Sequence, residues 1–358
     1  MPRERGPTLV IANHQHDLDS MAIMAMLTLQ GPWSKPIHTV SSRRMFERGF
    51  FAVRTPRLAP LLRRYDPTPL FLSLGPMPIE NDLRRRSLRS VALSVRRRHP
   101  NVRLDDVIPQ ELRESLGFDA AVRLDGLASR RWFERAEAAI ELRLLREPHR
   151  SEVRDETRRL LNEDLGRIER TLRAGGTFFL TPEGHYTLDG SLLRFRDAFT
   201  RLAPLADIWL AAISYDVLRG RRLSQLYRIV RPGRSDDVTS SLKAARPVTV
   251  SQLLASWLQS AEPVSFEAVA ATSAVRRRLA ELPQRLFIDP ELRCAPEAVT
   301  RNALLRCQRL GIVRRAGNRY RMNERRRHPS FPGVSDIVAH QARFFAETLQ
   351  AADALGAT

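Results

Sequence analysis

Two polar turns hold the side chains of this sequence that could transfer protons. The first, Asn13–Asp19 (NHQHDLD), follows the apolar run Thr8–Ala12. A histidine can take a proton from a hydroxyl group, and a nearby carboxylate can fix the tautomer of its ring and stabilise the imidazolium ion. The turn is therefore a candidate general-base site for a substrate that supplies its own hydroxyl. The alternative is a helix N-cap, in which Asp17 or Asp19 accepts hydrogen bonds from backbone amides.

The second turn, Thr181–His185 (TPEGH), follows another apolar run, Thr177–Leu180. Pro-Glu-Gly alone is a common turn. A polar turn directly after a buried strand carries more weight, because open α/β sheets bind ligands at the carboxyl ends of their strands. Two such turns, each with groups useful in acyl or phosphoryl chemistry, favour a shared site.

Short apolar runs indicate the elements that must position these turns. Thr8–Ala12, Thr177–Leu180 and Ile208–Tyr215 predict buried strands, and Ser20–Leu29 predicts an apolar helix directly after the first turn. This order of strand, polar turn and helix is typical of α/β proteins. We therefore expect an α/β fold with a mixed sheet flanked by helices.

The character of the chain changes after Pro247. Residues 1–246 are predicted to form the α/β core, with a helical insertion near 83–173. Residues 247–358 are predicted to be mainly helical. A helix at Pro296–Leu310 is followed by a hairpin that turns at Gly317-Asn318, which resembles a winged helix.

The charge of the chain points to an anionic partner. Lys plus Arg is 59 and Asp plus Glu is 40, so the formal net charge is +19. A surplus of this size favours nucleic acid, an anionic membrane or a phosphorylated substrate. Two cysteines, Cys294 and Cys307, exclude a disulfide scaffold and most metal clusters. His16, His185 and Asp17 match no standard zinc spacing, so we expect no metal.

The most basic block, Asp82–Arg103, contains eight arginines and one acidic residue. Its apolar residues could share one face of a helix, so one interpretation is a basic helix that docks on an anionic bilayer. The alternative is a solvated helix that pairs with the acidic residues of Arg130–Arg173. No apolar run is long enough for a transmembrane helix or a signal peptide. The proposed docking face consists of Leu83, Leu88, Val91 and Val95.

Four blocks of sequence follow one another over about residues 8–215. His14 is followed after four residues by Asp19, and Gly75–Glu80 reads as a glycine-led strand. Phe178–Arg196 contains Phe-Leu-Thr-Pro-Glu-Gly and then Gly-Ser-Leu-Leu-Arg-Phe, and Ala211–Tyr215 is a short apolar strand. In this order the blocks resemble the glycerolipid acyltransferase family, which includes lysophosphatidic acid and glycerol-3-phosphate acyltransferases.

The resemblance implies an enzyme of phospholipid biosynthesis in a bacterium. His14 would be the general base on the acceptor hydroxyl and Asp19 its orienting partner, while Glu183 and Gly184 would shape the acceptor site. The acyl donor would be acyl-CoA or acyl carrier protein, with no other cofactor and no acyl-enzyme intermediate. The acceptor would be glycerol phosphate or a lysophospholipid. The family's hydrophobic N-terminal anchor is absent, which implies either a cytoplasmic enzyme, peripheral on the inner face of the cell membrane, or a start placed too late.

Two departures from the family pattern concern the acceptor phosphate. Asn81 stands where the family usually has an arginine, and His185-Tyr186 follow Glu-Gly in place of Thr-Arg. Arg194 and Arg196 are candidate replacements, as are the arginines of 84–86. A non-phosphorylated lipid or sugar acceptor is the alternative within this class of enzyme.

A hypothesis from another class is a basic nucleic-acid-binding protein with a winged helix at residues 296–322. Aromatic residues make up only 7% of the chain and are not interleaved with the basic runs. Stacking residues are usual in proteins that bind single-stranded nucleic acid, so their scarcity argues against this hypothesis. We therefore expect no nucleic acid among the partners.

Overall fold

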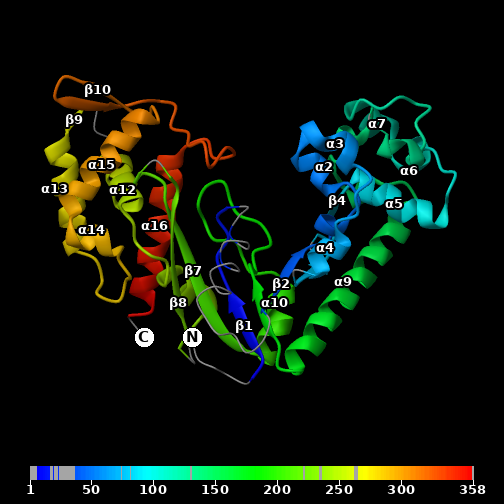
Figure 1. The fold of residues 1–358 in the computed structure, drawn as a ribbon, viewed down its shortest axis with the longest axis horizontal. Coiled ribbons are helices and arrows are strands. Elements are labelled where there is room, and N and C mark those ends of the chain that lie inside the picture. Colours follow the sequence, from blue (N-terminus) through cyan, green and yellow to red (C-terminus); the bar gives the residue numbers. More distant parts are fainter. Residues whose placement is uncertain are drawn as a thin grey trace. The chain divides into compact units, whose positions relative to one another are not determined.

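The computed structural model describes residues 6–16, 19, 23, 37–73, 75–80, 82–129, 131–220, 222–233, 236–261 and 265–356. They belong to two compact units, one from residues 1–35 and 177–358 and one from residues 36–176 (Figure 1). The first unit contains a four-stranded mixed sheet, and the second unit contains two further parallel strands. The expected mixed α/β class is confirmed. Asp17, Asn81 and, apart from Ile23, the expected helix Ser20–Leu29 lie outside the described residues.

The strands of the first unit follow the order β6-β1-β7-β8. β1 (Thr8–Ile11) pairs in parallel with β6 (Thr177–Leu180) and with β7 (Asp207–Asp216), and β7 pairs antiparallel with β8 (Ser224–Val230). Every residue of β1 and β6 is buried, as expected for parallel strands whose two faces are both covered. Because these strands are parallel neighbours, their carboxyl ends meet at one edge of the sheet.

The rest of the first unit is mainly helical, and helices α12 to α16 are drawn in yellow-green to red in Figure 1. α16 packs against α11 and α12, and β9, β10 and β11 form a small antiparallel sheet. The hairpin predicted at Gly317-Asn318 is present as the antiparallel pair of β10 and β11. The bounds are α10 (Asp197–Leu202), α11 (Val238–Ala244), α12 (Val250–Ala261), β9 (Phe266–Glu267), α13 (Ala268–Ala280), α14 (Pro290–Cys294), α15 (Pro296–Arg309), β10 (Val313–Ala316), β11 (Arg319–Met322) and α16 (Ile337–Ala354).

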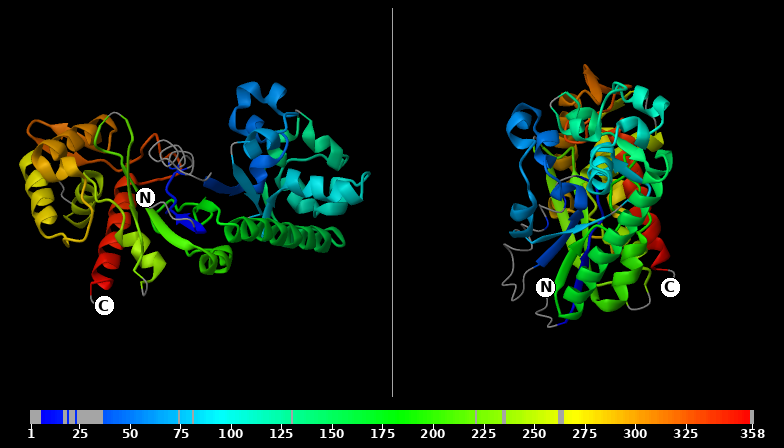
Figure 2. Two further views of the ribbon diagram at one scale, coloured as in Figure 1. Left: turned by 60° about the horizontal axis from the view of Figure 1, so that its bottom comes forward. Right: turned by 90° about the vertical axis from the view of Figure 1, so that its right-hand side faces the viewer.

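The second unit contains two pairs of strands and the long helix α9 (His149–Arg173), which Figure 2 shows as one continuous element. β2 (Ile37–Ser42) and β3 (Pro76–Ile79) are parallel, whereas β4 (Arg85–Ser87) and β5 (Ala139–Glu141) are antiparallel. None of the helices within the described residues is long and apolar enough to cross a bilayer. The other helices are α2 (Phe50–Arg54), α3 (Ala59–Leu62), α4 (Thr68–Ser73), α5 (Leu88–Arg98), α6 (Leu104–Val107), α7 (Gln110–Ser115) and α8 (Phe133–Ala136).

The basic block forms α5, but its apolar face is not available to a bilayer. Leu88, Val91 and Val95 are fully buried in the core of the second unit. The expected docking face is therefore wrong for these three residues, whereas its fourth member, Leu83, precedes the helix and is 45% exposed. These side chains lie on the face of α5 that packs into the hydrophobic core of the unit, whereas Leu93 of the same helix is 37% exposed.

Three arginines of this block pair with acidic residues between Arg130 and Arg173, as the alternative interpretation expected, but the helix is largely buried and not solvated. The Arg97 guanidinium lies 3.0 Å from the Glu156 carboxylate, and the Arg85 guanidinium lies 3.1 Å from that of Glu141. Arg89 is buried and forms an ion pair with Glu137. These ion pairs neutralise the charges of three arginines of the block with carboxylates of the same unit.

Candidate active site

The register of β1 and β6 brings the two polar turns together. The backbone N–H of Ala12 donates a hydrogen bond to the carbonyl of Leu180 at 3.1 Å, which continues the ladder by one residue. Beyond it, the backbone N–H of His14 donates to Glu183 Oε1 at 2.7 Å. Residues 169 positions apart in the sequence therefore form one site, at the edge of the sheet where the sequence predicts it.

His14 and Asp19 form the pair that the sequence predicts, with 3.0 Å between His14 Nδ1 and Asp19 Oδ2. Because a carboxylate only accepts hydrogen bonds, this contact places the ring proton on Nδ1 and leaves a lone pair on Nε2. Nε2 has no hydrogen-bond partner among the described residues. The His14 side chain is 16% exposed, so a substrate can reach it, whereas Asp19 is fully buried.

Asp19 Oδ2 also accepts the backbone N–H groups of Gln15 at 2.6 Å and His16 at 2.8 Å. These amides precede Asp19 in the chain, so within the described residues the carboxylate closes the turn behind it. The amides that a helix N-cap at Asp19 would accept belong to residues outside the described ones. The same oxygen that orients the His14 ring therefore also sets the backbone that carries it.

Tyr215, at the end of β7, holds the other oxygen of this carboxylate. Its hydroxyl donates a hydrogen bond to Asp19 Oδ1. Burial raises the pKa of Tyr215 well above its ordinary value of 10.0, and the charge of Asp19 raises it further. The phenol therefore stays protonated and keeps donating. The sequence predicts that Tyr215 ends a buried strand, but it carries no signal for this contact with Asp19.

Asn13 fastens the first turn to β7. Its Nδ2 donates to the carbonyl of Ile213 at 3.0 Å, and its Oδ1 accepts the N–H of Ile213 at 2.7 Å. The side chain thus imitates one more residue of strand pairing, and it is fully buried. Its position directly before His14 was the only sequence signal for it.

His16 packs as part of the wall, and its Nε2 lies 3.1 Å from the carbonyl oxygen of Ser330. Its ring lies against those of Tyr215 and Phe331, with centroids 5.7 and 5.5 Å away. These contacts favour His14 as the base of the turn.

Glu183 is buried and acts on the backbone of both turns. Its Oε1 accepts from His14, and its Oε2 accepts the N–H of Leu193 at 2.9 Å. Burial raises the pKa of Glu183 to about 7, although both backbone hydrogen bonds favour the charged form. With 1% of its surface exposed, Glu183 positions His14 and does not itself meet a substrate.

Gly184 and Arg196 complete the second turn. Gly184 has φ +78°, and a Cβ there would lie 2.4 Å from Arg196 Nε, so glycine is required. Arg196 donates from Nε to the carbonyl of Glu183 at 3.0 Å, and its Nη2 lies 3.1 Å from His185 Nδ1. Arg194 is exposed and makes no hydrogen bond or ion pair with another described residue. The structure therefore separates the two predicted phosphate ligands into one that braces the turn and one that is available.

A helix of the C-terminal region, α16, also contacts the second turn. The sequence does not predict this contact. Glu347 of α16 accepts the N–H of Leu192 at 3.0 Å and pairs with Arg246 at 3.2 Å. The Arg246 guanidinium is buried and stacks 4.0 Å from the ring centroid of Phe344. The local sequence carries no signal for this contact, because α16 contains a second carboxylate, Asp353, and Glu347 itself is 18% exposed.

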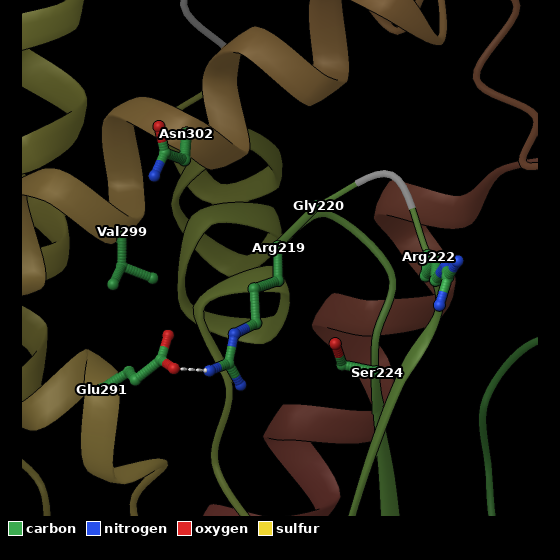
Figure 3. A pocket seen from close by; sticks show the side chains of 7 residues that line it. All are labelled: Arg219, Gly220, Arg222, Ser224, Glu291, Val299 and Asn302. Atoms are coloured by element: carbon green, nitrogen blue, oxygen red, sulfur yellow. Dashed lines mark ion pairs between the residues drawn. The ribbon is translucent and has the colours of Figure 1, made fainter.

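A cavity of about 330 Å³ lies elsewhere in the first unit, between the β7–β8 turn and helices α14 and α15 (Figure 3). Figure 3 shows Arg219 pointing at Glu291, and Arg219 also lies 3.2 Å from Asp289. Two carboxylates thus neutralise the arginine that points into this cavity. None of the residues predicted for the site lines it.

Replacing Glu183 by glutamine should remove a pH-dependent part of the stability. The folded protein binds the Glu183 proton more tightly than the unfolded chain, whose pKa is about 4.5. Protonation of Glu183 therefore stabilises the folded state fully below pH 4.5. This stabilisation, about 3 kcal/mol in total, is lost as the pH rises from 4.5 through 7. The Tm of wild type minus that of Glu183→Gln should fall from pH 5 to pH 8, and a constant difference would contradict the burial effect.

The chain matches no known protein-family model and no curated protein.

Proposed function

We propose that this protein is an acyltransferase. It moves a fatty acyl group from acyl-CoA or acyl carrier protein to a hydroxyl of a glycerol-phosphate or lysophospholipid acceptor, in phospholipid biosynthesis. The observation that carries the proposal is the His14–Asp19 pair, 3.0 Å apart, whose second ring nitrogen is left without a partner among the described residues. The four sequence blocks that resemble glycerolipid acyltransferases support it.

The geometry suits a direct transfer. Nε2 of His14 accepts the proton of the acceptor hydroxyl while the hydroxyl oxygen attacks the thioester carbonyl. The carbon–sulfur bond then breaks, and the leaving thiolate takes the proton back from the imidazolium ion. Asp19 stabilises that ion and holds the ring in one tautomer. The ester and the free thiol account for every atom, and no protein nucleophile is needed.

An acceptor panel tests the proposal. Purified full-length protein is incubated with acyl-CoA or acyl carrier protein and with glycerol 3-phosphate, lysophosphatidic acid or monoacylglycerol. Ester formation is followed by mass spectrometry of the lipid extract. We expect a new ester with at least one phosphate-bearing acceptor. No ester with any combination would overturn the proposal, and an ester with monoacylglycerol alone would favour a non-phosphorylated acceptor.

Arg194 and Arg196 should behave differently when replaced by methionine. If Arg194 binds the acceptor phosphate, Arg194→Met should raise the acceptor KM about tenfold or more and leave the donor KM unchanged, because it loses one charge-assisted hydrogen bond. Arg196→Met should instead lower kcat, since it releases the Glu183 carbonyl. Arg314→Met, at an exposed arginine of β10, is the control. An unchanged acceptor KM in Arg194→Met would point to an acceptor without phosphate.

A lipid acceptor requires a surface that meets a membrane, and α2–α4 of the second unit offer one. Of the eleven large hydrophobic side chains that the described residues expose, five fall within residues 58–72. The ring of Phe51 contacts those of Tyr65 and Phe71, which ties these helices together, and Arg57 and Arg64 are exposed. The exposed apolar residues, called the apolar patch here, are Leu58, Leu61, Tyr65, Leu70 and Leu72.

The apolar patch should bind anionic bilayers at the inner face of the cell membrane. Each exposed arginine contributes about 1 kcal/mol to binding near such a surface, and the exposed leucines add binding energy when they insert into the bilayer. Leu61→Glu should therefore reduce sedimentation with phosphatidylglycerol vesicles at least about tenfold, because Leu61 is 77% exposed. Val269→Glu, at a 70% exposed position of α13, is the matched control. Equal sedimentation of both variants with wild type would place the docking surface elsewhere.

A further inference from the structure

Two histidines and a glutamate meet inside the second unit, and none of them belongs to the candidate active site. His99 is the residue that follows the last turn of α5, and His149 is the first residue of α9. Glu152 lies three residues after His149, so both side chains lie on the same face of the first turn of α9. Two elements that are 50 residues apart in the sequence thus present three metal-ligating groups to one point.

The distances suit a single ion. His99 Nε2 lies 3.0 Å from both carboxylate oxygens of Glu152, and His149 Nδ1 lies 3.5 Å from Glu152 Oε2. One ligand atom from each residue lies within 4.8 Å of the others. Ligand atoms at about 2.0–2.1 Å from a tetrahedral zinc ion are about 3.3 Å apart. The three groups therefore surround an ion after small side-chain movements.

His149 supplies an independent reason to expect a ligand. It is 6% exposed, and its Nδ1 makes no hydrogen bond among the described residues, although Glu152 Oε2 lies 3.5 Å away. A buried ring nitrogen held only by this long contact is poorly satisfied, and a metal ion would use its lone pair. His99 and Glu152 are partly exposed, so an ion can enter and water can complete its coordination.

We propose that His99, His149 and Glu152 bind a zinc ion. Two imidazoles and one carboxylate are a donor set that zinc accepts, with water in the fourth position. The ion would tie the end of α5 to the start of α9 and so stabilise the second unit. No step of the proposed acyl transfer uses it, so the proposal stands whether or not that function is correct.

Cobalt serves as the optical probe for this site. Full-length protein freed of metal with a chelator is titrated with Co²⁺, and the visible absorbance is recorded. We expect one Co²⁺ per chain with the strong visible bands of a four- or five-coordinate ion, displaced by Zn²⁺. His99→Asn should weaken Co²⁺ binding by more than about 100-fold. Even the loss of a residue that only hydrogen-bonds to a metal ligand lowers metal affinity 10- to 100-fold. His14→Ala and His38→Asn should leave Co²⁺ binding unchanged.

Thermal unfolding distinguishes a lost ligand from a damaged fold. Without metal, His99→Asn should unfold at the Tm of the metal-free wild type, because His99 is partly exposed. Zn²⁺ should raise the Tm of wild type and of His14→Ala but not that of His99→Asn. No Co²⁺ binding by wild type would overturn the proposal and leave a plain His99–Glu152 ion pair. Undiminished binding by His99→Asn would overturn it as well.

Discussion

His14→Ala should transfer acyl groups about 10²- to 10⁴-fold more slowly than wild type, the usual contribution of a general base. The change removes Nε2, which has no partner among the residues that the structure describes, and with it the group that takes the acceptor proton. The contact with Glu183 is made by the backbone N–H of His14, so the variant keeps it. We therefore expect an unchanged fold and an unchanged KM for the acyl donor.

The measurement is kcat with acyl-CoA and the best acceptor of the panel, together with the Tm of each protein. His16→Ala is the matched control, because it removes a second imidazole from the same turn. His16 packs against Tyr215 and Phe331, so its loss should affect stability more than kcat. A His14→Ala enzyme that works at the wild-type rate would remove His14 from the mechanism.

Asp19→Asn should be almost as severe, again with a loss of about 10²- to 10⁴-fold in kcat. Asp19 Oδ2 accepts three hydrogen bonds, from the His14 ring and from two backbone amides. An asparagine has one oxygen and one NH₂ group, so it turns the NH₂ group either toward these three donors or toward the Tyr215 hydroxyl. One buried set of donors then lacks an acceptor, which costs about 1–3 kcal/mol of stability. The His14 ring also loses the charge that fixes its tautomer.

Two comparisons separate the orienting role of Asp19 from its structural one. Asp17→Asn makes the same change two positions earlier in the chain and should be mild. The double variant His14→Ala, Asp19→Asn should be no slower than His14→Ala alone, because Asp19 acts through His14. Multiplied losses in the double variant would show that Asp19 acts independently of the histidine.

The core of the site was predictable because it depends on local patterns and one general rule. The apolar runs that became β1 and β6 were read correctly, and parallel strands bring the turns after them to one edge. His14 and Asp19 meet there within one turn of chain. Gly184 also follows local logic, since its positive φ and the nearby Arg196 exclude a side chain.

The parts that sequence reasoning missed depend on contacts across the fold. Tyr215 reaches Asp19 from 196 positions away, and Glu347 reaches Leu192 from 155 positions away. Nothing in the local sequence distinguishes such a tyrosine or glutamate from a surface residue. The prediction that the apolar face of α5 docks on a bilayer was wrong for a related reason. Amphipathic periodicity shows that a helix has an apolar face, but the same pattern serves a protein core and a membrane equally well.

The central claim is that the acyl group passes directly from the thioester to the acceptor hydroxyl, with His14 as the base. The most direct test incubates wild type with acyl-CoA alone and then with acceptor, and measures released thiol, new ester and the intact mass of the protein. We predict no thiol release and no acylated protein without acceptor, and one thiol per ester once the acceptor is added. Thiol release without acceptor through an acylated protein would contradict direct transfer. If no ester forms under any condition, the proposed acyltransferase function is contradicted and the nucleic-acid-binding hypothesis is left.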